Sequence, residues 1–569
     1  MTPAILTVPT GTYPDSRKVG HIGGNMKTSA LLLLLLSIIT LSGCSSSSTD
    51  TPAMKVVSTS VTVSSKAETP AVNNSEIRTI ALTFSEKLDA NSIADGVKLY
   101  KVNAAGDMTS ENCLINIDPA APNILNVSKK DGTRLTLGEK YKLVISSKMK
   151  SGSGATIGND FVGYFSANYL TNLAGAATAE LSARSIIICI SDIHLGDKRS
   201  IDGGYGWFNK NREALVSFLT QVRVAPNVRE LVIAGDMFDE WLAPMATDTL
   251  NGLTQSGFVD SIATENQAII DAFNSIIKEG KIKVTYVTGN HDMQVTSVDV
   301  QRILPGISEA RDAQGLGAYS PLDHPEILIE HGHRYDFYNA PDPISNSTIT
   351  TYKDAILPLG FFVTKIGASI LGIGSAAGFV PDPTIAPWSE NQYMAQLPVT
   401  GIFNSKIINT GIDGYTDVYS VSDLIPHKTP DGSFDVTLYK GVVSTWPLRQ
   451  MKNKVPVKIT PTDAIKVGLI MADLDAQATT QYFQNADSVK RIVVFGHSHI
   501  PLMLAATNTK LEQTIYANSG TWIDNATTSM TFVAIIPPQT NGSATDVKLY
   551  QYSQTGITAL DSKSVTILK

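Results

Sequence analysis

From residue 186 onward, short strand-like runs alternate with helical patterns. The apolar runs lie at 186–190, 231–234, 327–329 and 492–495, and an alternating run lies at 282–287. A short apolar run that stops at glycine and polar residues is typical of a parallel strand buried on both faces. The segments 211–222 and 260–278 carry apolar residues at helical spacing. This alternation predicts an α/β fold with a mostly parallel sheet.

Further elements are predicted toward the C-terminus. Residues 460–482 form one long helical pattern that leads to the run at 492–495. Beyond that run, we expect closing strands of a second sheet at 531–536, 547–552 and 565–568.

The segment 53–168 has a different pattern, with short alternating stretches separated by breaks that contain Asn, Asp or Gly. Strands are expected at 77–84, 96–102, 124–127, 141–146 and 161–165. Such spacing predicts a separate all-β sandwich. Its sequence resembles the bacterial Ig-like domains that precede enzymes in exported proteins. It holds no cluster of ligand or acid/base residues, so we expect a spacer or docking module, joined through a linker at 169–184.

Each of these five strand-like runs, from 186–190 to 492–495, is followed by Asp, Asn or His. Asp192 and His194 follow the first run, and an oxygen and a nitrogen ligand could face one cation from this loop. The later runs are followed by G-D-M-F-D at 235–239, G-N-H-D at 289–292, E-H-G-H at 330–333 and G-H-S-H at 496–499. Six of the nine histidines lie in these corners. Because open α/β sheets bind ligands at the carboxyl ends of their strands, the pattern predicts one shared site.

The motifs D-x-H, G-D-x-x-D, G-N-H-D, H-G-H and G-H-x-H, in this order, resemble those of the calcineurin-like metallophosphoesterases. The resemblance covers 185–569 and implies an α/β sandwich of two sheets between helical layers, α/β/β/α, with two divalent metal ions. It leaves their identity open among Mn, Fe, Zn and Ni. It implies that Asp236 bridges the ions and that the other ligands divide into Asp192, His194 and His499 for one ion and Asn290, His331 and His497 for the other.

The resemblance also implies roles for residues beside the ions. His291, which no ion needs, would donate a proton to the leaving group, and Asp292 would orient or charge it. The residues expected behind the ligands or against substrate are Asp239, His333 and Arg334. Two cations would neutralise an anionic phosphate ester and lower the pKa of a bridging water, so that a bridging hydroxide attacks phosphorus. Only two of the seven ligands are carboxylates, and the centre should therefore remain cationic.

Within this family, the stretches 235–241 and 331–336 resemble most closely the branch that contains UDP-diacylglucosamine hydrolases. In that branch a lid for a lipid substrate follows the G-N-H-D region, whereas the long insertion here, at about 335–460, follows H-G-H. The sequence therefore predicts the branch and leaves the substrate open. Within the insertion, the apolar and glycine-containing segment 356–380 is either a buried helix or a hydrophobic lid over the metals.

The first 52 residues predict export. Lys27 precedes an apolar stretch that includes six consecutive leucines, and L-S-G-C at 41–44 resembles a bacterial lipobox. We therefore expect a lipoprotein signal peptide at 1–44, lipid on Cys44, translation from Met26 and a serine-rich tether at 45–52. The protein would lie on the periplasmic side of a membrane or at the cell surface. Cys113 and Cys189 remain in different predicted domains, and Cys189 should act as a small core residue.

Composition narrows the function classes. The chain of 569 residues has a net charge of −7 and no basic stripe, which argues against binding of long nucleic acids. A small phosphorylated substrate, lipid-linked or a nucleotide, fits better. The main hypothesis is therefore an exported, lipid-anchored phosphoesterase. Two alternatives stay open, which are a surface-anchored binding protein with an inactive enzyme fold, and a cyclic nucleotide phosphodiesterase or nuclease.

Overall fold

The computed structural model describes most of residues 53–567. Short loop gaps aside, the undescribed stretches are 174–183, 244–249, 346–355, 366–405 and, outside three short strands, 410–443. The predicted signal peptide, lipobox and tether, and most of the 356–380 segment, lie outside the described residues. None of the described helices is long and apolar enough to cross a membrane.

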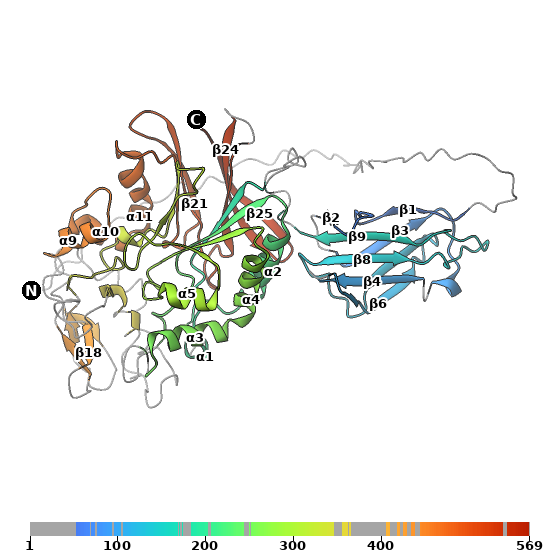
Figure 1. Ribbon diagram of the computed structural model, residues 1–569, viewed down its shortest axis with the longest axis horizontal. Helices are drawn as coiled ribbons and strands as arrows, with labels where there is room; N and C mark the ends of the chain where they lie inside the picture. The colour runs from blue at the N-terminus through green and yellow to red at the C-terminus, as the bar shows by residue number, and fades with distance from the viewer. Residues whose placement is uncertain are drawn as a thin grey trace, which may run out of the picture. The chain divides into compact units, whose positions relative to one another are not determined.

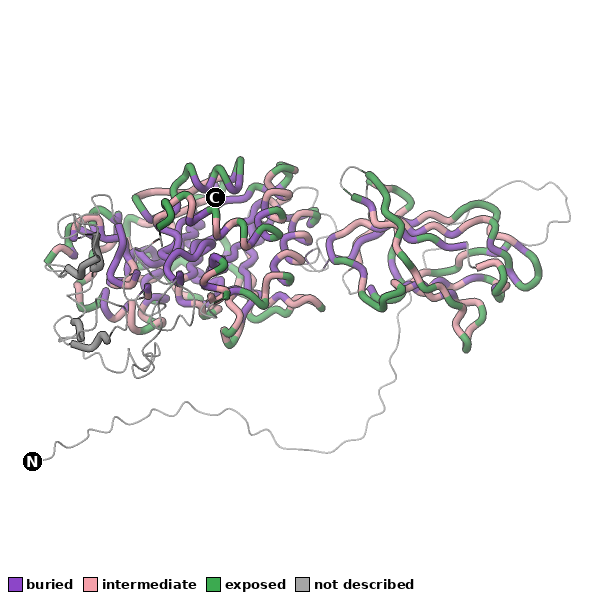
Figure 2. The backbone as a smooth tube through the Cα atoms, turned by 90° about the horizontal axis from the view of Figure 1, so that it is seen from below, coloured by how far each residue is buried: buried purple, intermediate pink, exposed green. Residues whose placement is uncertain are grey.

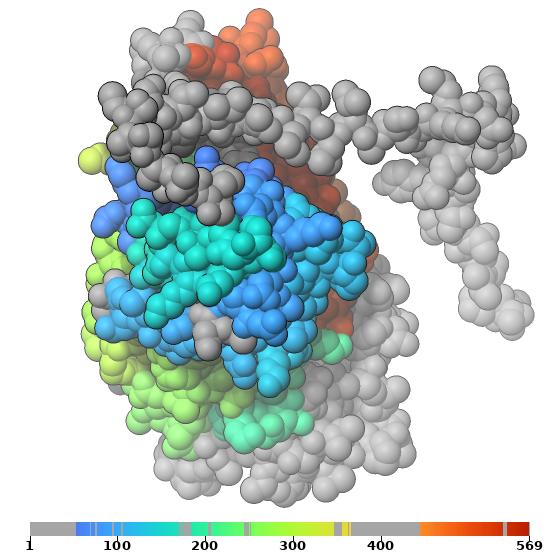
Figure 3. All heavy atoms as spheres, turned by 90° about the vertical axis from the view of Figure 1, so that its right-hand side faces the viewer, coloured from blue at the N-terminus to red at the C-terminus, as the bar shows by residue number. Residues whose placement is uncertain are grey.

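The N-terminal part is an all-β sandwich of two sheets around one core. The first sheet has the order β1-β3-β7-β6 and the second β2-β9-β8-β4-β5. Its strands are β1 (Val56–Thr59), β2 (Ala71–Asn73), β3 (Thr79–Phe84), β4 (Val97–Val102), β5 (Met108–Ser110), β6 (Cys113–Ile117), β7 (Ile124–Lys129), β8 (Lys140–Ile145) and β9 (Phe161–Ala167). All five predicted strands are present. Atoms of this N-terminal part are coloured blue to cyan in Figure 3.

Alternation explains this core. Along β3 and β8, every second residue is buried, and Leu82, Tyr141 and Leu143 meet in one hydrophobic cluster. The neighbouring residues on each strand are more exposed, so purple and pink or green alternate along the sandwich in Figure 2. The all-β prediction is therefore confirmed, whereas the Ig-like relationship stays a prediction.

The α/β part contains two larger sheets. The seven-stranded sheet has the order β13-β12-β11-β10-β23-β24-β25, and the five-stranded sheet has the order β14-β15-β20-β22-β21. The strands of the first are β10 (Ile186–Ile190), β11 (Val228–Ala234), β12 (Lys283–Val287), β13 (Ser308–Ala310), β23 (Thr531–Ile536), β24 (Ala544–Ser553) and β25 (Gly556–Thr566). Those of the second are β14 (Ala318–Tyr319), β15 (Ile327–Glu330), β20 (Ile492–Phe495), β21 (Leu502–Thr507) and β22 (Gln513–Asn518).

The apolar runs of β10 and β20 are buried on both faces. Ile188 and Ile190 of β10 pack against helices, whereas Ile187 and Cys189 point into the core between the two sheets. On β20, alternate residues pack into that intersheet core and into an outer cluster beneath helix α11 (Met471–Ala478). The layers are therefore helix, sheet, sheet and helix, and Cys189 is a core residue as expected.

Helices cover the outer face of the seven-stranded sheet (Figure 1). They include α2 (Arg212–Val224), α3 (Gln255–Glu265), α4 (Gln267–Glu279) and α5 (Ser297–Ile303), after the short α1 (Lys198–Asp202). On the five-stranded sheet lie α10 (Pro461–Leu469), α11 (Met471–Ala478) and a π-helical turn at Thr479–Phe483.

Three details of the sequence prediction were wrong. The strands β23 to β25 extend the first sheet, because β23 pairs antiparallel with β10, and strand signals alone name no partner. The helix predicted at 260–278 is two helices, which break where the Asn266 side chain bonds the Gly196 carbonyl. The helix predicted at 460–482 breaks at Ile470, which adopts an extended conformation.

The insertion is described in pieces. It contains a short 3-10 helix (His333–Tyr335), two hairpins formed by β16 (Lys406–Asn409) with β17 (Val418–Ser420) and by β18 (Ile425–Lys428) with β19 (Phe434–Thr437), and helix α9 (Trp446–Lys452). The described start of the 356–380 segment is buried, and Ile356 and Phe361 share a cluster with Trp241.

Candidate metal centre

The five predicted corners converge on one buried cluster of histidine, aspartate and asparagine side chains. β10, β11 and β12 run parallel in one sheet, and β15 and β20 run parallel in the other. Their carboxyl ends therefore present their corner residues toward the same place. Ligand atoms gather there in three overlapping groups that could hold a metal ion.

The first group contains the Asp192, His194, Asp236 and His499 side chains. The Nε2 atom of His499 lies 3.2 Å from Asp192 Oδ1 and 3.1 Å from His194 Nε2. His194 Nε2 lies 3.6 Å from Asp236 Oδ2. Three of these side chains are buried and His499 is partly exposed.

The second group contains Asp236, His331 and His497. His331 Nε2 lies 3.2 Å from Asp236 Oδ2 and 3.0 Å from the amide oxygen of Asn290. The two groups therefore share Asp236, which stands where the sequence predicts the bridging ligand. All seven predicted ligands lie in this cluster.

Two of the imidazoles, those of His194 and His331, have a partner behind them that fixes their orientation. His194 Nδ1 lies 2.9 Å from Asp239 Oδ2, and His331 Nδ1 donates to the Ala234 carbonyl at 2.8 Å. In both rings this leaves Nε2 for the centre. A carboxylate or carbonyl behind a histidine is the arrangement that metal sites use to hold the ring.

Asp336 is a member of this outer set that the sequence prediction missed. Its Oδ2 lies 3.1 Å from His497 Nε2 and also accepts from the Asn339 side chain. Its only sequence signal was its position, three residues after the second histidine of H-G-H.

The backbone is strained at the ligands. Asp192, His194, Asp236, His497 and His499 have φ between 52° and 67°, in the left-handed region that non-glycine residues rarely adopt. Neighbouring glycines allow close approach. A Cβ on Gly289 would lie 2.1 Å from Asp236 Oδ1, and one on Gly496 would lie 2.5 Å from Asp192 Oδ2. Strain of this kind persists only where the surrounding structure enforces it.

Charge in the cluster keeps the carboxylates ionised. Burial raises the pKa of Asp236, but the neighbouring His331 and His291 outweigh it and hold that pKa well below its usual range. Burial lowers the pKa of His331, and Asp236 and Asp192 outweigh it and raise that pKa to about 9. Two ionised oxygen ligands and several imidazoles therefore face one small volume, a donor set that suits borderline divalent metals. The residues present fit the implied ions.

His291 lies beside this donor set. Its Nδ1 is 3.0 Å from Asp239 Oδ1, and its ring stacks on Trp241 with the centroids 4.4 Å apart. Burial lowers its pKa, but the negative charges of Asp239 and Asp236 outweigh burial and raise it. The imidazolium form, which can donate a proton, is therefore favoured.

The partner predicted for His291 was wrong. Asp292 does not face the imidazole, and its carboxylate accepts from the backbone N–H groups of Met237 at 2.8 Å and Gly289 at 2.6 Å. It ties the G-D-x-x-D and G-N-H-D loops together. Asp239 occupies the role expected of Asp292, because the geometry of the two loops brings it to Nδ1.

His333 and Arg334 lie close behind H-G-H. The His333 ring centroid is 5.3 Å from that of His331, and His333 Nε2 is 3.0 Å from the Gly315 carbonyl. Arg334 is buried and pairs with Glu330 at 2.7 Å and Asp312 at 2.9 Å. Its charge is engaged by these carboxylates.

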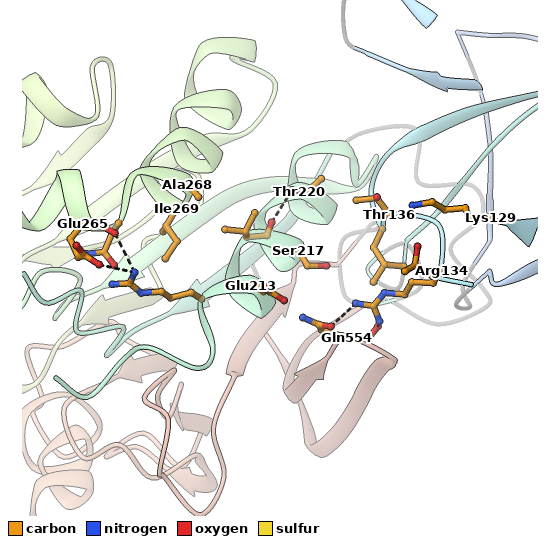
Figure 4. Close-up of a pocket in the computed structure, with 15 residues that line it drawn as sticks. Lys129, Arg134, Thr136, Glu213, Ser217, Thr220, Glu265, Ala268, Ile269 and Gln554 are labelled. Carbon is orange, nitrogen blue, oxygen red and sulfur yellow. Dashed lines mark hydrogen bonds and ion pairs between the residues drawn. The ribbon is translucent and has the colours of Figure 1, made fainter. Parts of the chain in front are cut away.

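A second concave region shares no residue with the metal cluster. Figure 4 shows its side chains, among which Arg212 pairs with Glu265 at 3.3 Å and Arg134 donates to Gln554 at 2.6 Å. None of the three metal-binding groups found among the described residues lies there.

The described residues thus form a mixed α/β fold with a buried cluster of side chains that could hold metal. Residues 186–359 match the family model of the calcineurin-like phosphoesterases. The chain therefore contains a calcineurin-like phosphoesterase domain, which together with the buried cluster indicates a metal-dependent phosphoesterase.

Other comparisons add little. No curated protein matches the chain. The solved structures that resemble it include PcoC, a copper resistance protein from Escherichia coli, at 14% identity and TM-score 0.16 over 20% of this chain and 99% of PcoC. CopC from Methylosinus trichosporium OB3b has 12% identity and TM-score 0.15 over 21% of this chain and 98% of its own. Domains 1–6 of the surface layer protein SbsC have 14% identity and TM-score 0.16 over 26% and 17%. TM-scores this low do not establish a shared fold.

Proposed function

We propose that this protein is an exported, lipid-anchored hydrolase of phosphate esters or anhydrides that uses two divalent metal ions. The observation that supports it is the pair of ligand groups that share Asp236. Asp192, His194 and His499 would hold one ion, and Asn290, His331 and His497 the other. Bound there, the ions would neutralise the phosphate and supply an activated water.

Side chains beside the ions would orient the ligands and supply a proton. Asp239 holds two rings at once, with one oxygen 2.9 Å from His194 Nδ1 and the other 3.0 Å from His291 Nδ1. His291 would give a proton to the oxygen that leaves phosphorus, which stabilises the leaving group. Trp241 and the buried insertion residues behind it exclude water from that side of the ring.

The test is a panel of hydrolysis rates. We expect release of phosphate or alcohol from at least one of an aryl monoester, an aryl diester, a cyclic nucleotide and a nucleotide diphosphate-sugar, with Mn, Zn, Ni or Fe supplied separately. The Asp236→Asn variant is the control for contaminating activity. Failure of every ester with every metal, in protein that binds two ions, would favour the binding protein with an inactive enzyme fold.

The anchor has its own test. Replacement of the proposed lipid site, Cys44→Ala, should release the protein from membranes on fractionation, because the anchor would then be lost. Continued tight membrane association would contradict the lipid anchor. The N-terminal sandwich, which we propose is Ig-like, would serve as a spacer between the anchor and the catalytic part.

A further inference from the structure

An indole that none of the motifs includes lies against the metal cluster. The Trp207 ring centroid is 4.9 Å from that of His194, 5.4 Å from that of His291 and 5.6 Å from that of His499. Trp207 itself is only partly buried. The indole therefore packs against three histidines of the cluster while Trp207 keeps part of its surface accessible to solvent.

The loop that carries Trp207 is held in place from the other end of the chain. The Asp524 carboxylate accepts from the backbone N–H groups of Asn209 at 2.8 Å, Lys210 at 2.9 Å and Asn211 at 3.1 Å. The N–H of Asp524 donates back to the Trp207 carbonyl at 2.8 Å. The next side chain, Phe208, is fully buried in the core. The position of Trp207 is thus fixed by these hydrogen bonds between the loop and Asp524 and by the buried Phe208 side chain next to it.

The indole lies on the side of the cluster where the leaving group of a substrate would be expected. The three histidines it touches are two proposed ligands of one ion and the proposed proton donor. An ester whose phosphorus lies at the ions and whose leaving oxygen lies at His291 must extend its organic part past that ring. Trp207 lies 5.4 Å from the same ring. A partly exposed aromatic face gains most from a flat aromatic or apolar group and little from a phosphate.

We propose that Trp207 determines specificity by stacking on the organic leaving group of the ester, and that Asp524 positions it. The leaving group is inferred to be flat, aromatic or heteroaromatic. This inference rests on the proposed function, since it places the phosphoryl group at the metal cluster.

Turnover on two matched substrates tests the role of Trp207. For Trp207→Ala we expect kcat/KM to fall about 10-fold on 1-naphthyl phosphate, mostly through KM, and less than about 3-fold on ethyl phosphate. Trp207→Phe, which keeps a ring, should recover most of the loss. Equal losses on both esters would show that the indole only packs against the histidines, and would overturn the proposal.

A binding measurement separates this proposal from the proposed function. Phenylphosphonate and inorganic phosphate are titrated into metal-loaded protein, with tryptophan fluorescence and calorimetry as readouts. Trp207→Ala should weaken phenylphosphonate about 10-fold and leave phosphate unchanged. If wild-type protein hydrolyses no ester but shows this difference, the proposed function fails and the binding role of Trp207 stands. Identical weakening of both ligands would contradict the role of Trp207.

The positioning role of Asp524 can be tested with a matched control variant. Asp524→Ala should reproduce the substrate-dependent loss of Trp207→Ala, and the double variant should lose no more than either single one, since both act through the same ring. Asn525→Ala is the control, because within the described part of this loop the Asn525 side chain meets the Lys210 ammonium, at 3.5 Å, and not the backbone that carries Trp207. Additive losses in the double variant, or the same loss in Asn525→Ala, would contradict the positioning role of Asp524.

Discussion

The N-terminal sandwich and the α/β part both turn sharply at the ends of their strands, but they use different residues to do so. Among the described residues of the sandwich, the positive-φ positions are glycines, such as Gly132 and Gly154. Among the described residues of the α/β part, five of the eight non-glycine residues with positive φ are predicted metal ligands. Glycine adopts this conformation without strain, whereas an aspartate or histidine does not.

Burial explains the difference. Strands of the sandwich bury one face, so their polar side chains reach solvent along the whole strand. Strands such as β10 and β20 are buried on both faces, and polar side chains find room only past the strand end. Among the described residues, strained turns are therefore concentrated where buried strands end and the predicted ligands converge.

The largest effect is expected at a glycine of the centre. Gly289→Ala would place a Cβ 2.1 Å from Asp236 Oδ1 and displace the side chain that we propose both ions share, so activity should fall roughly 10⁴-fold with loss of metal. Gly154→Ala in the sandwich is the control, since nothing lies within 4 Å of its added Cβ. It should lose some stability and no activity. An active, metal-loaded Gly289→Ala variant would contradict the contrast between the turns of the sandwich and those of the metal cluster.

A large loss without loss of metal is expected at His291. His291→Ala removes the proposed proton donor, so turnover of an alkyl ester should fall roughly 10²- to 10⁴-fold. A nitrophenyl ester should lose much less, because its leaving group hardly needs a proton. Elemental analysis should still find both metals. Equal losses on the two esters, with the metals retained, would show that His291 has another role.

The smallest effect concerns stability at a carboxyl group behind the last corner. Asp475 of α11 accepts from the Tyr516 hydroxyl and from Asn518, whose side chain holds the Gly496 carbonyl. Burial raises the Asp475 pKa to about 6, although both hydrogen bonds lower it. Because the folded pKa exceeds the unfolded one, ionisation destabilises the fold, and stability contributed by the protonated form is lost as pH rises from about 4 to about 6.

Asp475→Asn should therefore unfold less readily at pH 8 than the wild type, by about 1 to 2 kcal/mol, and show no gain near pH 4. Urea unfolding in the presence of a chelator measures this. Asp160→Asn in the sandwich is the control, since hydrogen bonds from Ser147 lower the pKa of that exposed carboxyl, and it should show no gain at pH 8. A pH-independent effect of Asp475→Asn would contradict the argument.

Much of the centre could be predicted because its residues follow strand ends in short motifs. The rule that parallel strands present their carboxyl ends together predicted one shared site, and the resemblance of the motifs supplied the set of ligands. Contacts that depend on how loops meet were missed. Asp239 rather than Asp292 faces His291, and Asp336 stands behind His497. The spacing of these residues in the sequence predicts neither pair.

The fold shows the same division. Strand positions were predicted from apolar runs, but the partner of β23 depends on sheet pairing across more than 300 residues of chain. At the break, the Asn266 side chain donates to the carbonyls of Gly196 and Ile262, and the contact with the distant Gly196 has no signal in the local sequence. The position of Trp207 could not be predicted from the sequence around it. Its loop is held beside the ligands by hydrogen bonds to Asp524, which lies far away in the sequence.

The central claim is that two ions share Asp236. The most direct measurement is metal content per chain, by elemental analysis after dialysis, for the wild type and Asp236→Asn at matched protein concentration. The account predicts two ions per wild-type chain and less than one in Asp236→Asn, with folding of both verified by circular dichroism. Two ions retained by folded Asp236→Asn, or only one in the wild type under saturating metal, would contradict it.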